Sequence, residues 1–441
     1  MSLPALSTTG PARFDPPVPM SIDDLGLPPF FLDQLTLKHL YFAGELTGRS
    51  LASHLGLNFS VVEPLLDALK RQRLLGVRSS MGMGTVSAFF TLTDAGRALA
   101  REYLDNNTYT GRAPVPLEQY SIGVQMQSIR EGWLEGANFR NAFQHMIISD
   151  RVLAQLGPAV NSGKSLLLYG QPGNGKTFLA EALFNLESDP VYIPFALECQ
   201  GHVIQLFDPV LHLDLDKPDK EESIFAVAPK EREYDGRWMR IKRPFIMSGG
   251  ELTLDMLDLT FNPASKVYDA PFHLRANNGI YLIDDFGRQR VSPSEVLNRW
   301  IVPMERRVDY LHFHTGGKVS VPFETFLVFS TNLHPKQLGD EAFLRRIAYK
   351  LYLRNPDEAE FLEIFELVCR QEHLAAPPAV IEELFERHYR AQKKPLRRCH
   401  PRDLVTHAID LIRFEHLNWE LTPEILDRAF EITFINAEYE D

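Results

Sequence analysis

The stretch Gly170-Gln171-Pro172-Gly173-Asn174-Gly175-Lys176-Thr177 decides the fold expected for this chain. It fits the pattern G-x-x-x-x-G-K-[ST] without a mismatch. The apolar run 165–170 before it predicts a buried strand, and the run 177–185 after it predicts a helix. Glycines let the backbone N–H groups turn inward around phosphate oxygens, and the helix adds its positive N-terminal end. We therefore predict a nucleotide site in which Lys176 contacts the phosphates and Thr177 ligates Mg²⁺. The predicted nucleotide-binding residues are Gly170, Pro172, Gly173, Asn174, Gly175, Lys176, Thr177 and Phe178.

A second apolar run, 279–284, ends in two adjacent carboxylates, Asp284 and Asp285. A carboxylate at a strand end downstream of such a loop is where the second Mg²⁺ contact belongs, and this assigns Asp284 to the metal. Asp285 is then placed to polarise an attacking water.

Together these motifs resemble those of the AAA+ ATPases. In that superfamily the second carboxylate is usually Glu, whose side chain is one methylene, ~1.5 Å, longer than Asp. A misplacement of about that size can lower a rate ~100-fold. Two interpretations of Asp285 therefore stay open: a working general base, or the mark of a slow, switch-like ATPase.

The resemblance extends along residues 121–441 and implies further site residues. Asn332, at the end of the apolar run 325–331, matches the sensor-1 position. Two alternating runs around Thr315-Gly316-Gly317-Lys318 predict a β-hairpin immediately before it, as in the pre-sensor-1 hairpin group that includes MoxR-like ATPases.

Two further motifs carry arginines. The segment 340–347 resembles the box that holds the arginine finger, with Arg345 and Arg346 as candidates to reach the nucleotide of a neighbouring subunit. Arg402 follows Pro401 at a helix start and resembles sensor 2. The resemblance thus implies a catalytic set of Asp285, Asn332, Arg345, Arg346 and Arg402.

The pattern of elements predicts an α/β fold in several parts. Residues 121–353 alternate strand and helix, which indicates a parallel sheet core, with strands at 165–170, 191–195, 279–284, 325–331 and 349–353. Residues 354–441 predict a lid of four helices, with starts at Asn355-Pro356 and Thr422-Pro423. The separation of Lys176 from Asp284 is long for the AAA+ core, and the surplus forms an insertion at about 199–275. The insertion either grips a partner or is a surface elaboration.

The N-terminal part predicts a separate domain. Residues 1–30, rich in Pro, Ser and Gly, predict a flexible segment, and 106–120 a linker. Between them, 31–105 reads as three helices, a hairpin around 81–84 and a closing helix, which resembles a winged helix-turn-helix with its recognition helix at about 60–75. Residues 24–105 contain eight Lys or Arg and eight Asp or Glu. Because DNA-tracking modules usually carry a basic surplus, protein contact is favoured over DNA binding, which stays an alternative.

The composition narrows the class of protein. The 441 residues carry a net charge of −12, which argues against a general nucleic-acid or membrane-surface protein. Three widely spaced cysteines give no disulfide or zinc pattern, and no apolar run is long enough to cross a membrane, so we expect a cytoplasmic location.

The first interpretation is an ATP hydrolase that assembles as a homo-oligomeric, hexameric ring and remodels a protein or protein–nucleic acid partner. The expected cofactors are ATP and Mg²⁺, with ATP favoured over GTP because the sequence has no guanine-reading N-K-x-D motif. The alternatives are a nucleotide-switched DNA-binding regulator and a helicase loader.

Overall fold

The computed structural model describes residues 14–80, 85–129, 136–186, 188–216, 233–339 and 344–434. The chain divides into two compact units. The first comprises Met1–Glu131, Ser188–Tyr281 and Glu295–Phe326, and the second comprises Gly132–Glu187, Leu282–Ser294 and Leu327–Asp441. These two units do not coincide with the domains expected at 31–105, 121–353 and 354–441. The domain borders expected from the sequence therefore stay predictions.

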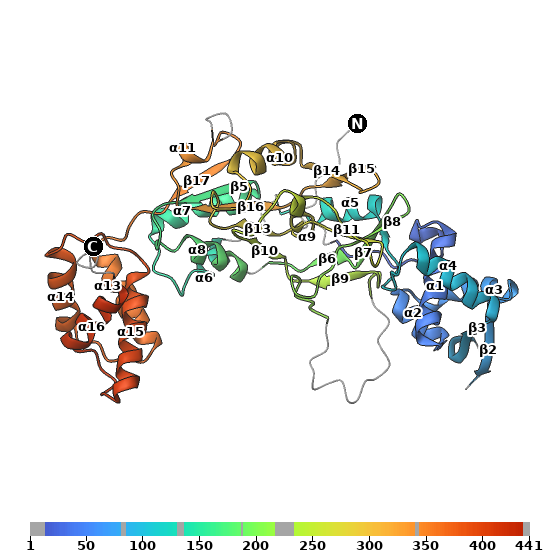
Figure 1. Cartoon of the computed structure of the whole chain (residues 1–441), viewed down its shortest axis with the longest axis horizontal. Helices are drawn as coiled ribbons and strands as arrows, with labels where there is room; N and C mark the ends of the chain where they lie inside the picture. Colours follow the sequence, from blue (N-terminus) through green and yellow to red (C-terminus); the bar gives the residue numbers. More distant parts are fainter. Residues whose placement is uncertain are drawn as a thin grey trace, which may run out of the picture. The chain divides into compact units, whose positions relative to one another are not determined.

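The N-terminal part of the first unit follows the predicted order of elements (Figure 1). Its helices and strands are α1 (Pro29–Ala43), β1 (Glu45–Thr47), α2 (Gly48–Leu55), α3 (Phe59–Arg71), β2 (Leu75–Ser80), β3 (Ala88–Leu92) and α4 (Asp94–Asn106). The strands form an antiparallel sheet in the order β1-β3-β2. Buried side chains of all four helices, among them Leu32, Leu51 and Leu66, pack against Phe90 of the sheet. The predicted turn at 81–84 lies outside the described residues, and the assignment as a winged helix stays a prediction.

Part of the segment predicted to be flexible, 1–30, is packed. A short 3₁₀ helix covers Asp23–Leu25, and Leu25 and Leu27 lie in the hydrophobic core of the N-terminal helices. Pro29 begins α1, where a missing N–H costs nothing. The prolines of this segment therefore stiffen a packed chain over residues 14–30, and the first 13 residues lie outside the described part.

The remainder of the first unit is mostly β-structure. Its elements are β4 (Val115–Pro116), α5 (Leu117–Met126), β6 (Val191–Pro194), β7 (Ala196–Cys199), β8 (His202–Gln205), β9 (Trp238–Ile241), β10 (Phe245–Ser248), β11 (Thr260–Asn262), β12 (Val267–Asp269), α9 (Phe272–Arg275), α10 (Pro293–Arg306), β14 (Val308–His312) and β15 (Lys318–Pro322). The hairpin β14–β15 is confirmed, with Val308 opposite Pro322. The predicted insertion at 199–275 thus contains ordered strands, β8 to β12, and its acidic segment, 214–222, is described only as far as Asp216.

One predicted strand of the parallel core is wrong in its pairing. Residues 191–194 are buried, but β6 pairs antiparallel with β9, with Val191 opposite Ile241. A short apolar run shows that a strand is buried and does not show which sheet it joins. Here the burial comes from the second hydrophobic core, in which Val191 and Ile241 pack with Trp238.

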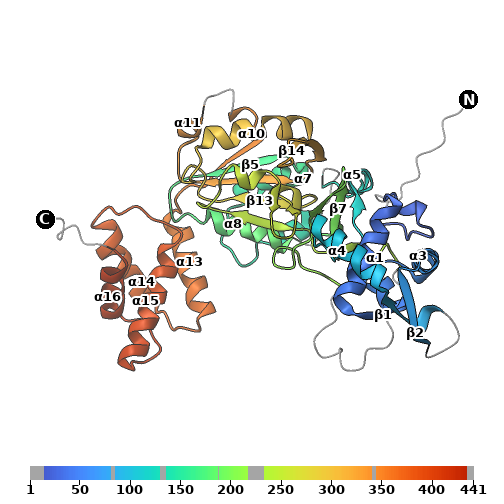
Figure 2. The ribbon, with the colours of Figure 1, turned by 45° about the vertical axis from the view of Figure 1, so that its right-hand side comes forward.

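Strands β5 (Ser165–Tyr169) and β17 (Tyr349–Tyr352) and most of β16 (Phe326–Thr331), all of the predicted parallel core, lie in the second unit. One five-stranded sheet of the chain has the order β10-β13-β16-β5-β17, where β13 is Ile280–Ile283. Both β16 and β17 pair with β5 in parallel. The helices α7 (Asp150–Ser162) and α8 (Lys176–Ala182) precede and follow β5, and α7 packs on β5 and β17 (Figures 1 and 2). Two short helices, α6 (Gly136–Asn141) and α11 (Pro335–Leu338), complete this part.

The predicted helical lid is present as a bundle of four helices (Figure 2). These are α13 (Glu358–Gln371), α14 (Pro378–Leu384), α15 (His400–Glu415) and α16 (Pro423–Thr433), and residues 385–390 continue α14 as a π-helical segment. Phe361, Phe365, Leu404 and Phe430 lie in their common core. The predicted start at Thr422-Pro423 is confirmed, because the Thr422 hydroxyl caps Ile425. The start at Asn355-Pro356 is wrong: α13 begins two residues later, where Asp357 accepts a hydrogen bond from the Glu360 amide.

Candidate nucleotide site

The predicted phosphate loop joins β5 to α8 in the second unit. The curled loop requires positive φ at three glycines: 153° at Gly170, 77° at Gly173 and 77° at Gly175. Residues with a side chain rarely adopt such values, because their Cβ clashes with the backbone. Helix α8 then begins at Lys176, so its first N–H groups face the same point as the loop. The local geometry therefore explains the glycine spacing seen in the sequence.

Lys176 lies buried at the base of this loop, with 6% of its surface exposed. Its Nζ donates to the carbonyl oxygens of Gly170 and Gln171 at 3.1 and 3.0 Å and to Asn332 Oδ1 at 2.6 Å. Burial lowers the pKa of Lys176, and the nearby carboxylates Asp284 and Asp285 oppose that shift. Oxygen atoms thus surround the ammonium group and stabilise its charged form.

The two residues predicted to hold the metal lie side by side. Thr177 Oγ1 lies 3.0 and 2.9 Å from the two carboxylate oxygens of Asp284, and donates a hydrogen bond to them. Mg²⁺ prefers oxygen ligands and is usually held by one or two carboxylates together with phosphates and water. Within the described residues no group of three or more His, Cys, Asp or Glu side chains is arranged to hold a metal. This donor pair fits a magnesium ion that takes its other ligands from a nucleotide and water.

Asp285 stands beside the predicted sensor residue. Asn332 Nδ2 donates to Asp285 Oδ1 at 2.9 Å, while Asn332 Oδ1 accepts from Lys176. The backbone of Asp285 has a φ of 48°, in the left-handed region, although it is not a glycine. Asp285 is exposed and so can meet solvent. Asn332 therefore links the phosphate-binding lysine to the candidate base in one continuous network.

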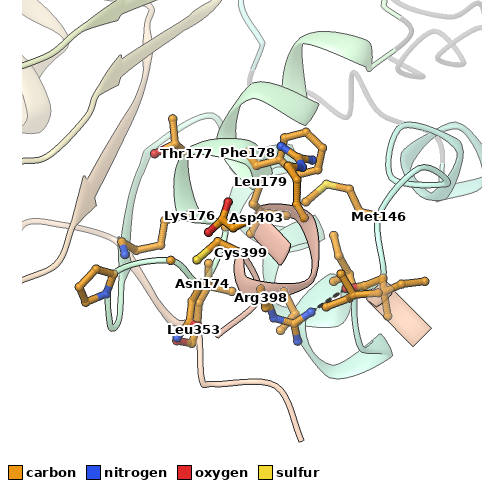
Figure 3. A pocket seen from close by; sticks show the side chains of 18 of the residues that line it. Met146, Asn174, Lys176, Thr177, Phe178, Leu179, Leu353, Arg398, Cys399 and Asp403 are labelled. Atoms are coloured by element: carbon orange, nitrogen blue, oxygen red, sulfur yellow. Dashed lines mark hydrogen bonds between the residues drawn. The ribbon is translucent and has the colours of Figure 1, made fainter. Parts of the chain in front are cut away.

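A cavity of about 460 Å³ opens beside this network (Figure 3). It is lined by the loop residues 172–179, by Asp285 and Asn332, and by apolar side chains from two sources. Met146, Ile147 and Val152 come from the segment before β5, and Ile364, Leu367 and Val368 come from α13 of the lid. The cavity thus combines a polar end with an apolar end, as a site for a phosphorylated ring compound would.

Arg402 is one of the cavity-lining residues. Its guanidinium lies 5.0 Å from the centre of the Phe178 ring, so it stacks on the helix that follows the phosphate loop. The other predicted arginines lie elsewhere: Arg345 is exposed, Arg346 is half-buried, and neither lines the cavity. The first four residues of their motif, 340–343, lie outside the described residues.

Several residues of the site are missed by sequence reasoning. Asn355 Oδ1 accepts from Asn174 Nδ2 at 2.8 Å and from Arg397 Nη1 at 2.6 Å, which ties the phosphate loop to the lid. The Cys399 amide donates to Gly173 O at 2.9 Å. Arg398 donates to Ile147 O at 2.7 Å, drawn as a dashed line in Figure 3. No nucleotide-site motif marks these positions, and Asn355 is interpreted from the sequence only as a helix cap.

Comparisons with known proteins give limited information. A domain of unknown function (DUF8689) matches residues 357–432, the helical bundle. No curated protein matches the chain. Among solved structures, the Holliday junction branch migration motor RuvB of Thermotoga maritima is 15% identical, with a TM-score of 0.35 over 69% of this chain and 72% of that chain. NtrX from Brucella abortus is 13% identical, with a TM-score of 0.39 over 79% of this chain and 63% of that chain. Both similarities are weak, so an assignment of function depends on the geometry of the chain's own residues.

No helix within the described residues has both the length and the apolar character needed to span a membrane.

Proposed function

We propose that this chain is an AAA+ ATPase that binds ATP with Mg²⁺ in the cavity of the second unit and hydrolyses it. The observation that carries this proposal is the Lys176–Asn332–Asp285 network, which lies at the polar end of the cavity next to the Thr177–Asp284 pair. A structural role alone does not account for two carboxylates, a buried lysine and an amide gathered at the mouth of a glycine-rich loop.

Each residue has a role that follows from its place. Lys176 and the loop N–H groups bind the phosphates, and Thr177 and Asp284 would hold Mg²⁺, which neutralises charge developing on the transferred phosphoryl group. Asp285 accepts a proton from the attacking water, and Asn332 orients that water and the carboxylate. Arg402 contributes positive charge from the lid side.

We propose further that the active form is a ring of identical subunits, in which Arg345 or Arg346 completes the site of a neighbour. The exposure of Arg345 outside its own cavity supports this arrangement. The hairpin β14–β15, which directly precedes the Asn332 strand, supports placement in the pre-sensor-1 hairpin group. The N-terminal helices and sheet would then serve as a winged-helix module for a protein partner, and hydrolysis would remodel that partner.

The test compares ATP binding and ATP hydrolysis by the purified full chain and by Lys176→Ala. The parent is expected to bind ATP in a Mg²⁺-dependent manner and to release phosphate in steady state. Lys176→Ala is expected to lose both activities, because the phosphates lose their buried counter-charge. A parent chain that binds no nucleotide would refute the proposal, and one that binds ATP with no turnover would leave a nucleotide switch.

A further inference from the structure

The turn that carries the two carboxylates has an unusual backbone. Strand β13 ends at Ile283, and within the next four residues both Asp285 and Gly287 take left-handed φ values, of 48° and 105°. A left-handed conformation at a residue with a side chain persists only where its surroundings hold it. Contacts from neighbouring residues must therefore hold this turn in place.

One side of the turn is fixed by strand β16. The Phe286 amide donates to Ser330 O at 2.7 Å, and Thr331 Oγ1 donates to Phe286 O at 2.6 Å. The Phe286 ring is 1% exposed and packs against Phe329, with ring centres 5.0 Å apart. These contacts anchor the middle of the turn to β16.

The Arg288 amide donates to Asp285 O at 2.9 Å within the turn, and the Gln289 side chain adds a bridge between residues on the two sides of Asp285. Its Oε1 accepts from the Gly287 amide at 2.7 Å, and its Nε2 donates to Asp284 O at 2.8 Å. Both bonds go to the backbone, one on each side of Asp285. Gln289 does not line the cavity, so it acts on the site only through the turn.

We propose that Gln289 is a positioning residue for hydrolysis, which closes the left-handed turn and so aims the Asp285 carboxylate at Asn332 and the attacking water. This inference depends on the proposed ATPase function. In this backbone conformation the short carboxylate lies 2.9 Å from Asn332 Nδ2, and a shift of about 1 Å at such a group can lower rates ~100-fold. In this proposal, the bridge from Gln289 holds the conformation that offsets the methylene Asp285 lacks.

The experiment measures kcat, KM and the dissociation constant of ATP for the parent, Gln289→Ala and Gln289→Met. Methionine keeps the length of the side chain and loses both hydrogen bonds. We expect kcat to fall between ~10-fold and ~100-fold while ATP affinity stays within about twofold of the parent. Gln144→Ala is the matched control, because Gln144 is an exposed glutamine of the same unit whose Nε2 donates to Asn141 Oδ1. Its kcat is expected to equal that of the parent.

A double-mutant cycle separates positioning from general structural damage. If Gln289 acts only through Asp285, Gln289→Ala lowers the residual kcat no further in an Asp285→Asn background. An equal fold-loss in both backgrounds, or a parent-like kcat in both Gln289 variants, overturns the inference while the ATPase proposal stands. If the parent chain shows no turnover, the proposed ATP hydrolysis and the role of Gln289 in it are both refuted.

Discussion

At the scale of single residues, the backbone of Asp285 gives a physical reason for an aspartate where glutamate was expected from the resemblance. Left-handed φ values are tolerated best by Gly, which has no Cβ, and by Asn and Asp, whose short polar side chains form local hydrogen bonds. Asp285, with φ of 48°, takes such a conformation, and its carboxylate still reaches Asn332. The shorter side chain and the unusual turn therefore belong together.

The first prediction concerns the chemistry of this side chain. Asp285→Asn keeps the backbone conformation and removes the base, so kcat is expected to fall by ~100-fold or more while ATP binding is retained. Asp285→Glu keeps a carboxylate on a less suitable backbone and is expected to have a kcat between those of the parent and Asp285→Asn. Steady-state phosphate release with a parallel ATP-binding assay checks both, and a glutamate variant faster than the parent would contradict the argument.

The second prediction compares two glycines of the phosphate loop that share a φ of 77°. A Cβ at Gly173 would lie 2.6 Å from Cys399 Sγ, whereas a Cβ at Gly175 meets nothing within 4 Å. Gly175→Ala is expected to lower the free energy of unfolding by about 1–2 kcal/mol from the backbone alone. Gly173→Ala is expected to lower it by a further 1–3 kcal/mol or so from overpacking.

Urea unfolding without nucleotide measures both variants. The control is the double variant Gly173→Ala/Cys399→Ala, which removes the crowding sulfur and is expected to recover most of the difference. If Gly173→Ala and Gly175→Ala prove equally stable, the close approach of lid and loop is wrong.

The residues of the site differ in how far the sequence could predict them. Lys176, Thr177, Asp284 and Asn332 were predicted, and the structure brings them together, because each motif fixes a residue to the end of a strand or the start of a helix. Gln289 could not be predicted, since its role depends on the φ values of neighbours that no motif encodes.

At the scale of elements, the lid bundle begins its helix α15 with a buried histidine. His400 is 9% exposed, its Nδ1 lies 3.2 Å from the Tyr389 hydroxyl, and the Phe434 ring packs against it. Burial, with Lys394 and Arg397 nearby, lowers the pKa of His400 to about 4. Between about pH 4 and pH 6.5, the folded lid therefore keeps the His400 ring mostly neutral, whereas the unfolded chain protonates it.

The third prediction follows from the direction of that shift. Between pH 6.5 and pH 4 the unfolded state binds more protons than the folded state, so stability falls as the pH falls. We expect His400 to account for a loss of about 2 kcal/mol in the free energy of unfolding from pH 7 to pH 5. Urea unfolding at both pH values should show a correspondingly smaller loss in His400→Phe. The exposed His416, changed to Asn, is the control and should behave as the parent; a His400→Phe variant with the parent's pH dependence would contradict the assignment.

Helix starts and strand pairings show which structural features a local sequence pattern can predict. The start of α16 was predicted because Thr422-Pro423 combines a cap with a proline. The same pattern at Asn355-Pro356 failed because the Asn355 side chain is bonded to Asn174 and Arg397, and Asp357 caps α13 in its place. Likewise β6 is as apolar as a core strand, and only its partner β9, distant in sequence, decides its sheet.

At the scale of the whole molecule, the fourth prediction tests assembly. If Arg345 or Arg346 serves a neighbouring subunit, turnover per chain should rise with protein concentration. Arg345→Ala or Arg346→Ala should lower kcat by ~1,000-fold or more without loss of ATP binding. Phosphate release per chain, measured over a roughly 100-fold range of protein concentration around the assembly midpoint, tests whether turnover rises with concentration.

Mixing identifies the arginine. Lys176→Ala keeps its arginines and lacks its own nucleotide site, so adding it to the inactive arginine variant should restore part of the turnover. Turnover per chain that is independent of concentration, together with two active arginine variants, would show that each chain works alone.

The left-handed turn at Asp285 also limits how this position can change during evolution. Among the single-base changes to an aspartate codon, those to Asn and Gly suit the backbone and remove the carboxylate, whereas the change to Glu keeps the carboxylate and suits the backbone poorly. Every such step thus loses either the chemistry or the conformation. A glutamate at this position is therefore expected to reach full activity only together with a changed turn, so that the side chain and the backbone change as a coupled pair.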